Sequence, residues 1–154
     1  MTAIPMLQLA LDYISLPSAL ATVESALRVA QDMGKEMLME LTGVRDIIAR
    51  AEEWREIGVE RMVYHRGWDE QIFDRQWQPE DLVVVQQLID MGFKVTVTGG
   101  ITVDLLPFFK ELAVSVIITG RAIHQAENPV ASARQIRSAI ARLWGGSDEE
   151  WPYK

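Results

Sequence analysis

Short apolar runs alternate with amphipathic segments along this chain of 154 residues. Four intervening segments place apolar side chains at the three- and four-residue spacing of a helix buried on one face. These predicted helices are Ser18–Met33, Asp46–Ile57, Glu80–Met91 and Pro129–Trp144. The apolar runs have the length of buried strands. These predicted strands are Met6–Leu11, Met37–Leu41, Arg61–Tyr64, Val95–Thr98 and Val114–Thr119.

Three of the predicted helices end in the same way. Gly34, Gly58 and Gly92 each follow a helical segment and come shortly before an apolar run, as expected of glycines in the left-handed conformation that ends a helix. Ser18 is placed to cap the start of the first helix. The repeated order of strand, helix and glycine predicts an α/β fold of parallel (β/α) units.

The number of strands limits the architecture. Five (β/α) units of roughly 30 residues each account for the length of the chain. A closed barrel of this type has eight strands and about 200 residues or more. We therefore expect either an open five-stranded sheet or a (β/α)₈ barrel that lacks three strands. Residues 1–144 are predicted to form a single domain. Residues 145–154 contain two glycines and three acidic residues, which predicts a flexible acidic tail.

Composition excludes several classes of function. The net charge of −7 disfavours binding to nucleic acid or to an anionic membrane. The chain has no cysteine, which excludes disulfides and zinc–thiolate sites. No apolar run approaches the roughly 20 residues that span a bilayer, and the first residues have no basic segment of the kind found in signal peptides. We expect a soluble, cytoplasmic protein.

Polar or flexible residues follow every predicted strand. Because the carboxyl ends of parallel strands meet at one edge of a sheet, these residues are expected to lie together, where α/β proteins bind their ligands. Taken singly, each has a simpler explanation: Asp12 as a helix cap, for example, or His65 as a packed side chain. Together they favour a site. The strand ends are Asp12, Glu40 to Gly43, His65-Arg66, Thr98 to Gly100 and Thr119 to Arg121.

The last two strand ends predict a phosphate site. Glycines at 99, 100 and 120 allow backbone N–H groups to approach an anion closely. Arg121 adds a planar cation that suits phosphate oxygens. The alternative is that these glycines only turn the chain and that Arg121 forms a surface ion pair.

Five motifs, in this order, carry a resemblance to a known family: LQLALD, ELTG, VYHR, DMGFKVTVTGG and TGRAI. From Met6 to Trp144 the chain resembles the 3-keto-L-gulonate 6-phosphate decarboxylase family. That family belongs to the orotidine 5′-phosphate decarboxylase superfamily of (β/α)₈ barrels and is related to hexulose-6-phosphate synthase. The resemblance implies a carboxy-lyase of L-ascorbate and sugar-acid catabolism. It would convert a phosphorylated keto-sugar acid to L-xylulose 5-phosphate through an enediolate.

The resemblance also implies roles for individual residues. Asp12 would contact the sugar hydroxyls, and Thr98 would lie beside the phosphate. Glu40 would lie in the substrate pocket, and His65 would return a proton to the enediolate. The phosphate would be held by Gly99, Gly100, Gly120 and Arg121.

Half of the family's catalytic machinery is missing from the sequence. The family carries an Asp-x-Lys-x-x-Asp motif and a metal-binding glutamate, which hold Mg²⁺ and place a lysine near the enediolate. No Asp-x-Lys occurs here, so no metal ligand is assigned, and Trp68 stands where the family usually has an arginine. The resemblance therefore implies an internal deletion of the second to fourth strands and an impaired activity.

Three hypotheses remain for the function. The chain is a carboxy-lyase of reduced activity, a phosphosugar-binding remnant without chemistry, or a deletion product with no function of its own. Aldol chemistry in place of decarboxylation is a further alternative. Because a sheet without its full set of strands has uncovered edges, we also expect a homodimer or higher self-association.

Overall fold

The computed structural model describes residues 16–66 and 76–145, which fall into two compact units divided between Met37 and Leu38. In the first unit, helix α1 (Leu16–Asp32) is followed by Gly34 at φ 63°. The predicted cap at Ser18 is wrong, because the helix begins two residues earlier and Ser18 lies in its first turn. Pro17 suits that turn, since a first-turn residue needs no partner for a backbone N–H.

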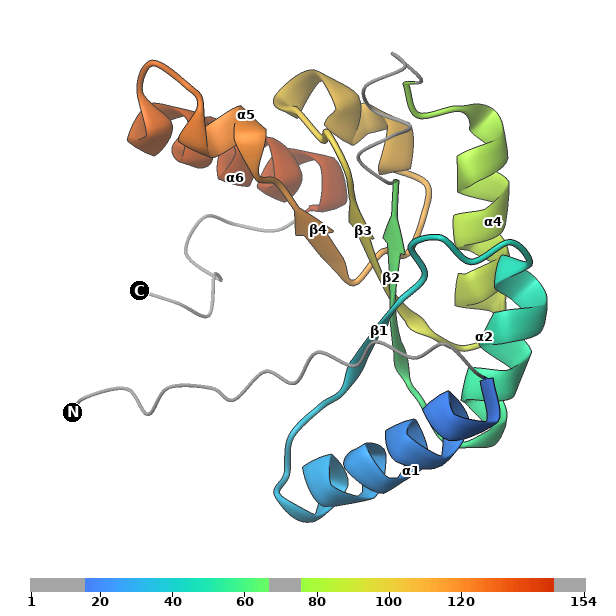
Figure 1. Cartoon of the computed structure of the whole chain (residues 1–154). Helices are drawn as coiled ribbons and strands as arrows, with labels where there is room; N and C mark the ends of the chain where they lie inside the picture. Colours follow the sequence, from blue (N-terminus) through green and yellow to red (C-terminus); the bar gives the residue numbers. More distant parts are fainter. Residues whose placement is uncertain (1–15, 67–75, 146–154) are drawn as a thin grey trace. The chain divides into compact units, whose positions relative to one another are not determined.

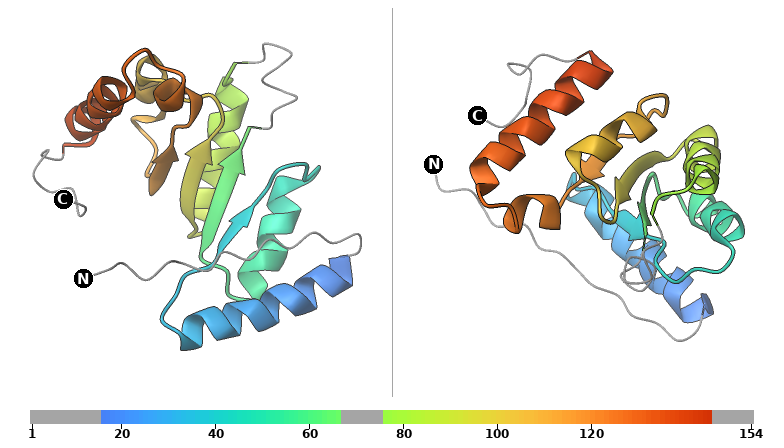
Figure 2. Two further views of the ribbon diagram at one scale, coloured as in Figure 1. Left: turned by 60° about the vertical axis from the view of Figure 1, so that its left-hand side comes forward. Right: turned by 90° about the horizontal axis from the view of Figure 1, so that it is seen from above.

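The described residues of the second unit form four parallel strands in sequential order (Figures 1 and 2). The strands are β1 (Leu38–Glu40), β2 (Arg61–His65), β3 (Lys94–Thr98) and β4 (Val116–Ile118). The predicted α/β class, the parallel pairing and these four strands are confirmed. The fifth predicted strand, Met6–Leu11, lies outside the described residues.

Helices α2 (Ile47–Glu56) and α4 (Pro79–Asp90) connect the first three strands and pack against each other (Figure 1). Asp46 caps α2 by accepting a hydrogen bond from the backbone N–H of Ala49 at 3.0 Å. Gly58 and Gly92 follow the two helices at φ 90° and 93°. The glycine pattern in the sequence therefore marked helix ends correctly, because these positive φ angles favour glycine.

Two short helices were not predicted from the sequence. The 3₁₀ helix η1 (Val103–Phe109) follows β3, and the single turn α5 (Arg121–His124) follows β4. Both are too short to show an apolar repeat, and η1 contains Pro107. Helix α6 (Pro129–Trp144) has the predicted bounds and packs against both η1 and α5.

The core lies around the two central strands. Met62 of β2 and Val95 and Val97 of β3 are fully buried, together with Val85 and Leu88 of α4. The outer strands are different: Leu38 in β1 is 47% exposed, and Val116 and Ile118 in β4 are each 43% exposed. Both edge strands of the described sheet therefore present apolar side chains to solvent.

Several predictions lie outside the described residues. They concern Asp12, Trp68 and the tail after Gly145. Within the described residues, no helix combines the length and the apolarity needed to cross a membrane. The single domain 1–144 stays a prediction.

Candidate functional site

Strand register brings the predicted site residues to one edge of the sheet. His65 of β2 pairs with Thr98 of β3, which pairs with Ile118 of β4. Leu41 continues the ladder after β1, because its N–H donates to the carbonyl of Val63 at 3.1 Å. The loops that follow all four strands therefore leave the sheet at the same edge, as the sequence predicted.

Glu40 and His65 form a pair at this edge. Nδ1 of His65 lies 2.6 Å from Oε1 of Glu40, and the hydroxyl of Thr42 donates to the same carboxylate oxygen. Because an ionised carboxylate only accepts hydrogen bonds, the contact assigns the proton to Nδ1 of the imidazole. Nε2 is then the ring nitrogen that can accept a further proton and pass it on.

Thr42 and His65 keep Glu40 ionised. The hydrogen bond from Thr42 lowers the pKa of the Glu40 carboxyl below its usual value of 4.5, and burial opposes this effect. The hydrogen bond and the charge of His65 lower the pKa further. Glu40 is therefore a hydrogen-bond acceptor that orients the imidazole, and it carries negative charge at neutral pH.

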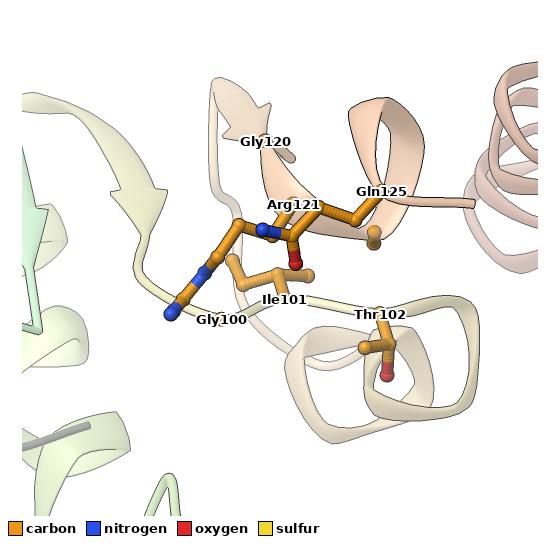
Figure 3. A pocket seen from close by; sticks show the side chains of 7 residues that line it. Gly100, Ile101, Thr102, Gly120, Arg121 and Gln125 are labelled. Carbon is orange, nitrogen blue, oxygen red and sulfur yellow. The ribbon is translucent and has the colours of Figure 1, made fainter. Parts of the chain in front are cut away.

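A cavity of about 280 Å³ lies between the loops after β3 and β4 (Figure 3). Its lining combines three of the four predicted phosphate residues, Gly100, Gly120 and Arg121, with Gln125 one turn later in the chain. In Figure 3 the Arg121 side chain extends toward the loop at Gly100, and the Gln125 side chain points toward Arg121. The remaining lining residues are Ile101, Thr102 and Ala122.

Gly99 and Thr98 do not line the cavity, in contrast to Gly100, Gly120 and Arg121. Gly99 is buried against the loop after β2, where a Cβ atom on it would lie 2.6 Å from the carbonyl oxygen of Arg66. The hydroxyl of Thr98 donates to the carbonyl of Ile118 at 3.4 Å. Gly99 is therefore required by close packing of two backbones, whereas Gly100 borders the open cavity.

Two residues near this cavity, Gln125 and Trp77, are not among the site residues predicted from the sequence. Gln125 lies four positions after Arg121, a spacing that places two residues on one side of a helical turn. Trp77 is buried and donates from its Nε1 to the carbonyl of Gly99 at 2.8 Å. Nothing in the sequence around Trp77 distinguishes it from an ordinary core tryptophan.

The Mg²⁺ ion that the resemblance implies does not fit the residues described here. Mg²⁺ prefers an octahedral set of oxygen ligands, among them carboxylates. Within residues 16–66 and 76–145, no three acidic, histidine or cysteine side chains come together as a set that could hold a metal ion. Glu40 is instead engaged with His65 and Thr42.

Comparisons with known proteins agree with this fold. The family described as "Orotidine 5′-phosphate decarboxylase / HUMPS family" matches residues 8–136. The 3-keto-L-gulonate-6-phosphate decarboxylase UlaD of Salmonella typhi is 44% identical over 124 residues, which are 80% of this chain and 57% of that protein.

Solved structures give the same result. The enzyme KGPDC from Streptococcus mutans, in complex with D-R5P, superposes with a TM-score of 0.77 at 35% identity and covers 82% of this chain and 59% of its own. The 3-hexulose-6-phosphate synthase from Salmonella typhimurium reaches 0.73 at 27% identity, covering 80% of this chain and 58% of its own. The chain thus spans little more than half the length of these relatives. By its matched residues and its fold, this chain belongs to the orotidine 5′-phosphate decarboxylase / HUMPS family.

Proposed function

We propose that the chain binds a phosphorylated keto-sugar acid and acts on it as a carboxy-lyase of the 3-keto-L-gulonate 6-phosphate decarboxylase type, at a reduced rate. The observation that carries this proposal is the cavity shared by Gly100, Gly120 and Arg121, at the same sheet edge as the Glu40–His65 pair. The phosphate end and the reacting end of one substrate would each meet suitable groups there.

The cavity has the chemistry of an anion site. The guanidinium of Arg121 is charged at every physiological pH and can donate two parallel hydrogen bonds to phosphate oxygens. Gly100 has a φ of 68° and no side chain that would cover its backbone N–H. The relative from Streptococcus mutans was solved in complex with D-R5P, which supports a sugar phosphate as the class of ligand.

The Glu40–His65 pair supplies the proton chemistry. When the C–C bond to the carboxylate breaks, its electron pair stays on the sugar as an enediolate, and CO₂ leaves. A proton must then be added to carbon, and a protonated Nε2 of His65 can deliver it while Glu40 holds the ring through Nδ1. General acid catalysis of this kind contributes typically about 10²–10⁴ in rate.

The reduced rate follows from the missing cations. A developing enediolate needs positive charge beside it, and loss of one preorganised donor of this kind costs roughly 10²–10³ in rate. The only lysines are Lys35, Lys94, Lys110 and Lys154. Lys94 begins β3, at the opposite end of the sheet from the site, and its Nζ lies 3.1 Å from a carboxylate oxygen of Glu60.

The proposal is tested by CO₂ release from 3-keto-L-gulonate 6-phosphate with Mg²⁺ present. We expect slow turnover that Arg121→Ala and His65→Ala each reduce further. Turnover as fast as in full-length relatives would contradict the predicted impairment. No turnover together with saturable ligand binding would favour the second candidate, a phosphosugar-binding remnant, for which the cavity alone is sufficient.

The deletion hypothesis has a separate test. The chain covers only 57–59% of the length of these relatives. This coverage supports the proposal that strands two to four of the barrel are missing. The proposed role of the chain is in cytoplasmic sugar-acid catabolism. Re-sequencing the source gene distinguishes an authentic internal deletion from a full-length reading frame. A chain that binds no sugar phosphate and releases no CO₂ would be a deletion product without function.

A further inference from the structure

The peptide group between Gly99 and Gly100 is oriented by a hydrogen bond to its carbonyl oxygen. Its carbonyl oxygen accepts the hydrogen bond from Nε1 of Trp77 at 2.8 Å. In a planar trans peptide the C=O and the following N–H point in opposite directions. The bond from Trp77 therefore aims the N–H of Gly100 away from the indole ring. Gly100 is exposed and lines the cavity with Arg121, whereas Trp77 is only 5% exposed.

Neighbouring contacts fix the rest of this loop. The carbonyl of Thr98, one residue earlier, accepts a hydrogen bond from the N–H of Arg66 at 3.2 Å. Gly99 itself packs so closely on Arg66 that no Cβ fits. Two successive carbonyls are thus held by residues outside β3, and the loop has little freedom to rotate the Gly99–Gly100 peptide while both bonds remain.

Trp77 is in turn positioned by an aromatic cluster. The rings of Trp77 and Phe109 form a T-shaped contact with centroids 4.8 Å apart, and Tyr64 lies 5.7 Å from Trp77 in a tilted arrangement. Edge-to-face pairs of this geometry favour one ring orientation. The indole N–H is therefore presented to Gly99 in a fixed direction.

We propose that Trp77 is a positioning residue for phosphate binding, because it orients the Gly100 N–H into the cavity as a donor to the phosphate. This inference rests on the proposed function of the cavity. Trp77 does not line the cavity and would not touch the ligand. Its effect is to preorganise a backbone donor, which reduces the ordering that binding would otherwise require.

The first test compares two conservative variants of the aromatic cluster. Trp77→Phe keeps an apolar ring but removes the N–H donor, and Tyr64→Phe removes a hydroxyl of the same cluster that does not reach Gly99. Calorimetric titration with inorganic phosphate and with D-R5P should show affinity lowered about 3- to 10-fold in Trp77→Phe, the range of one net hydrogen bond. Tyr64→Phe should bind like the wild type. Equal affinity of Trp77→Phe and wild type overturns the role of Trp77.

A second measurement needs no folded variant. In a phosphate titration of the ¹⁵N-labelled wild type, the Gly100 amide proton should shift downfield with the same midpoint as the calorimetric binding. A Gly100 resonance that stays unchanged at saturation overturns the inference, even if Trp77→Phe fails to fold. Wild-type protein that binds neither ligand would refute the proposed function as well. Phosphate binding without a Gly100 shift would refute only the role of Trp77.

Discussion

At the residue scale, one sequence motif contains two glycines with different requirements. Gly99 is needed because its backbone packs on Arg66, and Gly100 is needed because it borders the cavity at a positive φ. The sequence predicted the pair as a phosphate loop. It could not separate the two roles, because the close approach to Arg66 is a contact between distant parts of the chain.

Substitution of Gly99 by alanine should destabilise the protein strongly. The added Cβ would lie 2.6 Å from the Arg66 carbonyl oxygen, and overpacking of this kind costs about 1–3 kcal/mol. The φ of 112° adds a cost of about 1–2 kcal/mol for a residue with a side chain. Gly92→Ala is the matched control, because Gly92 has a φ of 93° and open space around it. Urea unfolding should show a clearly larger loss for Gly99→Ala, and equal losses would contradict the packing argument.

The environment of Glu40 gives a prediction in pH. Because the pKa of Glu40 is lowered, the Thr42 and His65 contacts stabilise the fold fully above pH 4.5 and lose their effect as pH falls through the lower folded value. Thr42→Val removes the largest lowering contribution and should raise the pKa of Glu40. A ¹³C NMR titration of the Glu40 carboxyl measures this pKa in the wild type and in Thr42→Val. An unchanged midpoint in Thr42→Val would contradict the assigned cause.

At the element scale, Asp81 joins the start of α4 to the end of β2. One carboxylate oxygen accepts from the N–H of Gln78 at 2.8 Å and the other from the hydroxyl of Tyr64 at 2.6 Å. Asp81 is 6% exposed. Because both its oxygens are engaged, the carboxylate holds helix and strand together just before the aromatic cluster around Trp77.

We therefore expect Asp81→Asn to lower the free energy of unfolding by about 1–3 kcal/mol, since the amide offers one acceptor oxygen in place of two and lacks the charge that strengthens both buried hydrogen bonds. Asp90→Asn is the control, because Asp90 lies exposed at the other end of the same helix, with its carboxylate 2.7 Å from the amide of Gln86. Thermal unfolding of the wild type and the two variants measures the loss of stability in each variant. A loss in Asp90→Asn as large as in Asp81→Asn would contradict the role of Asp81.

Elements with a clear repeat were predicted well from the sequence. The bounds of α6 and the central strands β2 and β3 agree with the predicted segments to within a residue, because burial imposes a regular pattern on their side chains. Helices η1 and α5 were missed because they are single short segments held by packing on α6. Arg121 lies in α5, which was not predicted. The phosphate site was therefore predicted only from the residue types and from the order of the strands.

At the scale of the whole molecule, the exposed apolar side chains on both edge strands of the described sheet predict association with a second copy. Exposed apolar edge strands are templates for pairing with another chain, and Leu38, Val116 and Ile118 are all more than 40% exposed. Sedimentation velocity should show an association that strengthens with concentration. Val116→Lys should weaken it, because a charged residue on an edge strand opposes pairing.

Val83→Lys provides the control for that experiment, since Val83 is 57% exposed on α4 and away from the sheet edge. It should leave the association unchanged. A wild-type chain that stays monomeric over the whole concentration range would contradict the prediction. Sequence length predicted a sheet with fewer strands than a closed eight-stranded barrel, but the identity of the exposed edge strands required the strand order.

We propose that the cavity bounded by Gly100, Gly120 and Arg121 holds the phosphate of a sugar phosphate. Calorimetric titration of L-xylulose 5-phosphate into wild-type and Arg121→Ala protein tests it most directly. Loss of charge-assisted hydrogen bonds worth about 1.5–3 kcal/mol predicts saturable binding that weakens roughly 10- to 100-fold in Arg121→Ala. Absence of binding to the wild type, or equal affinity of the two proteins, would contradict the claim.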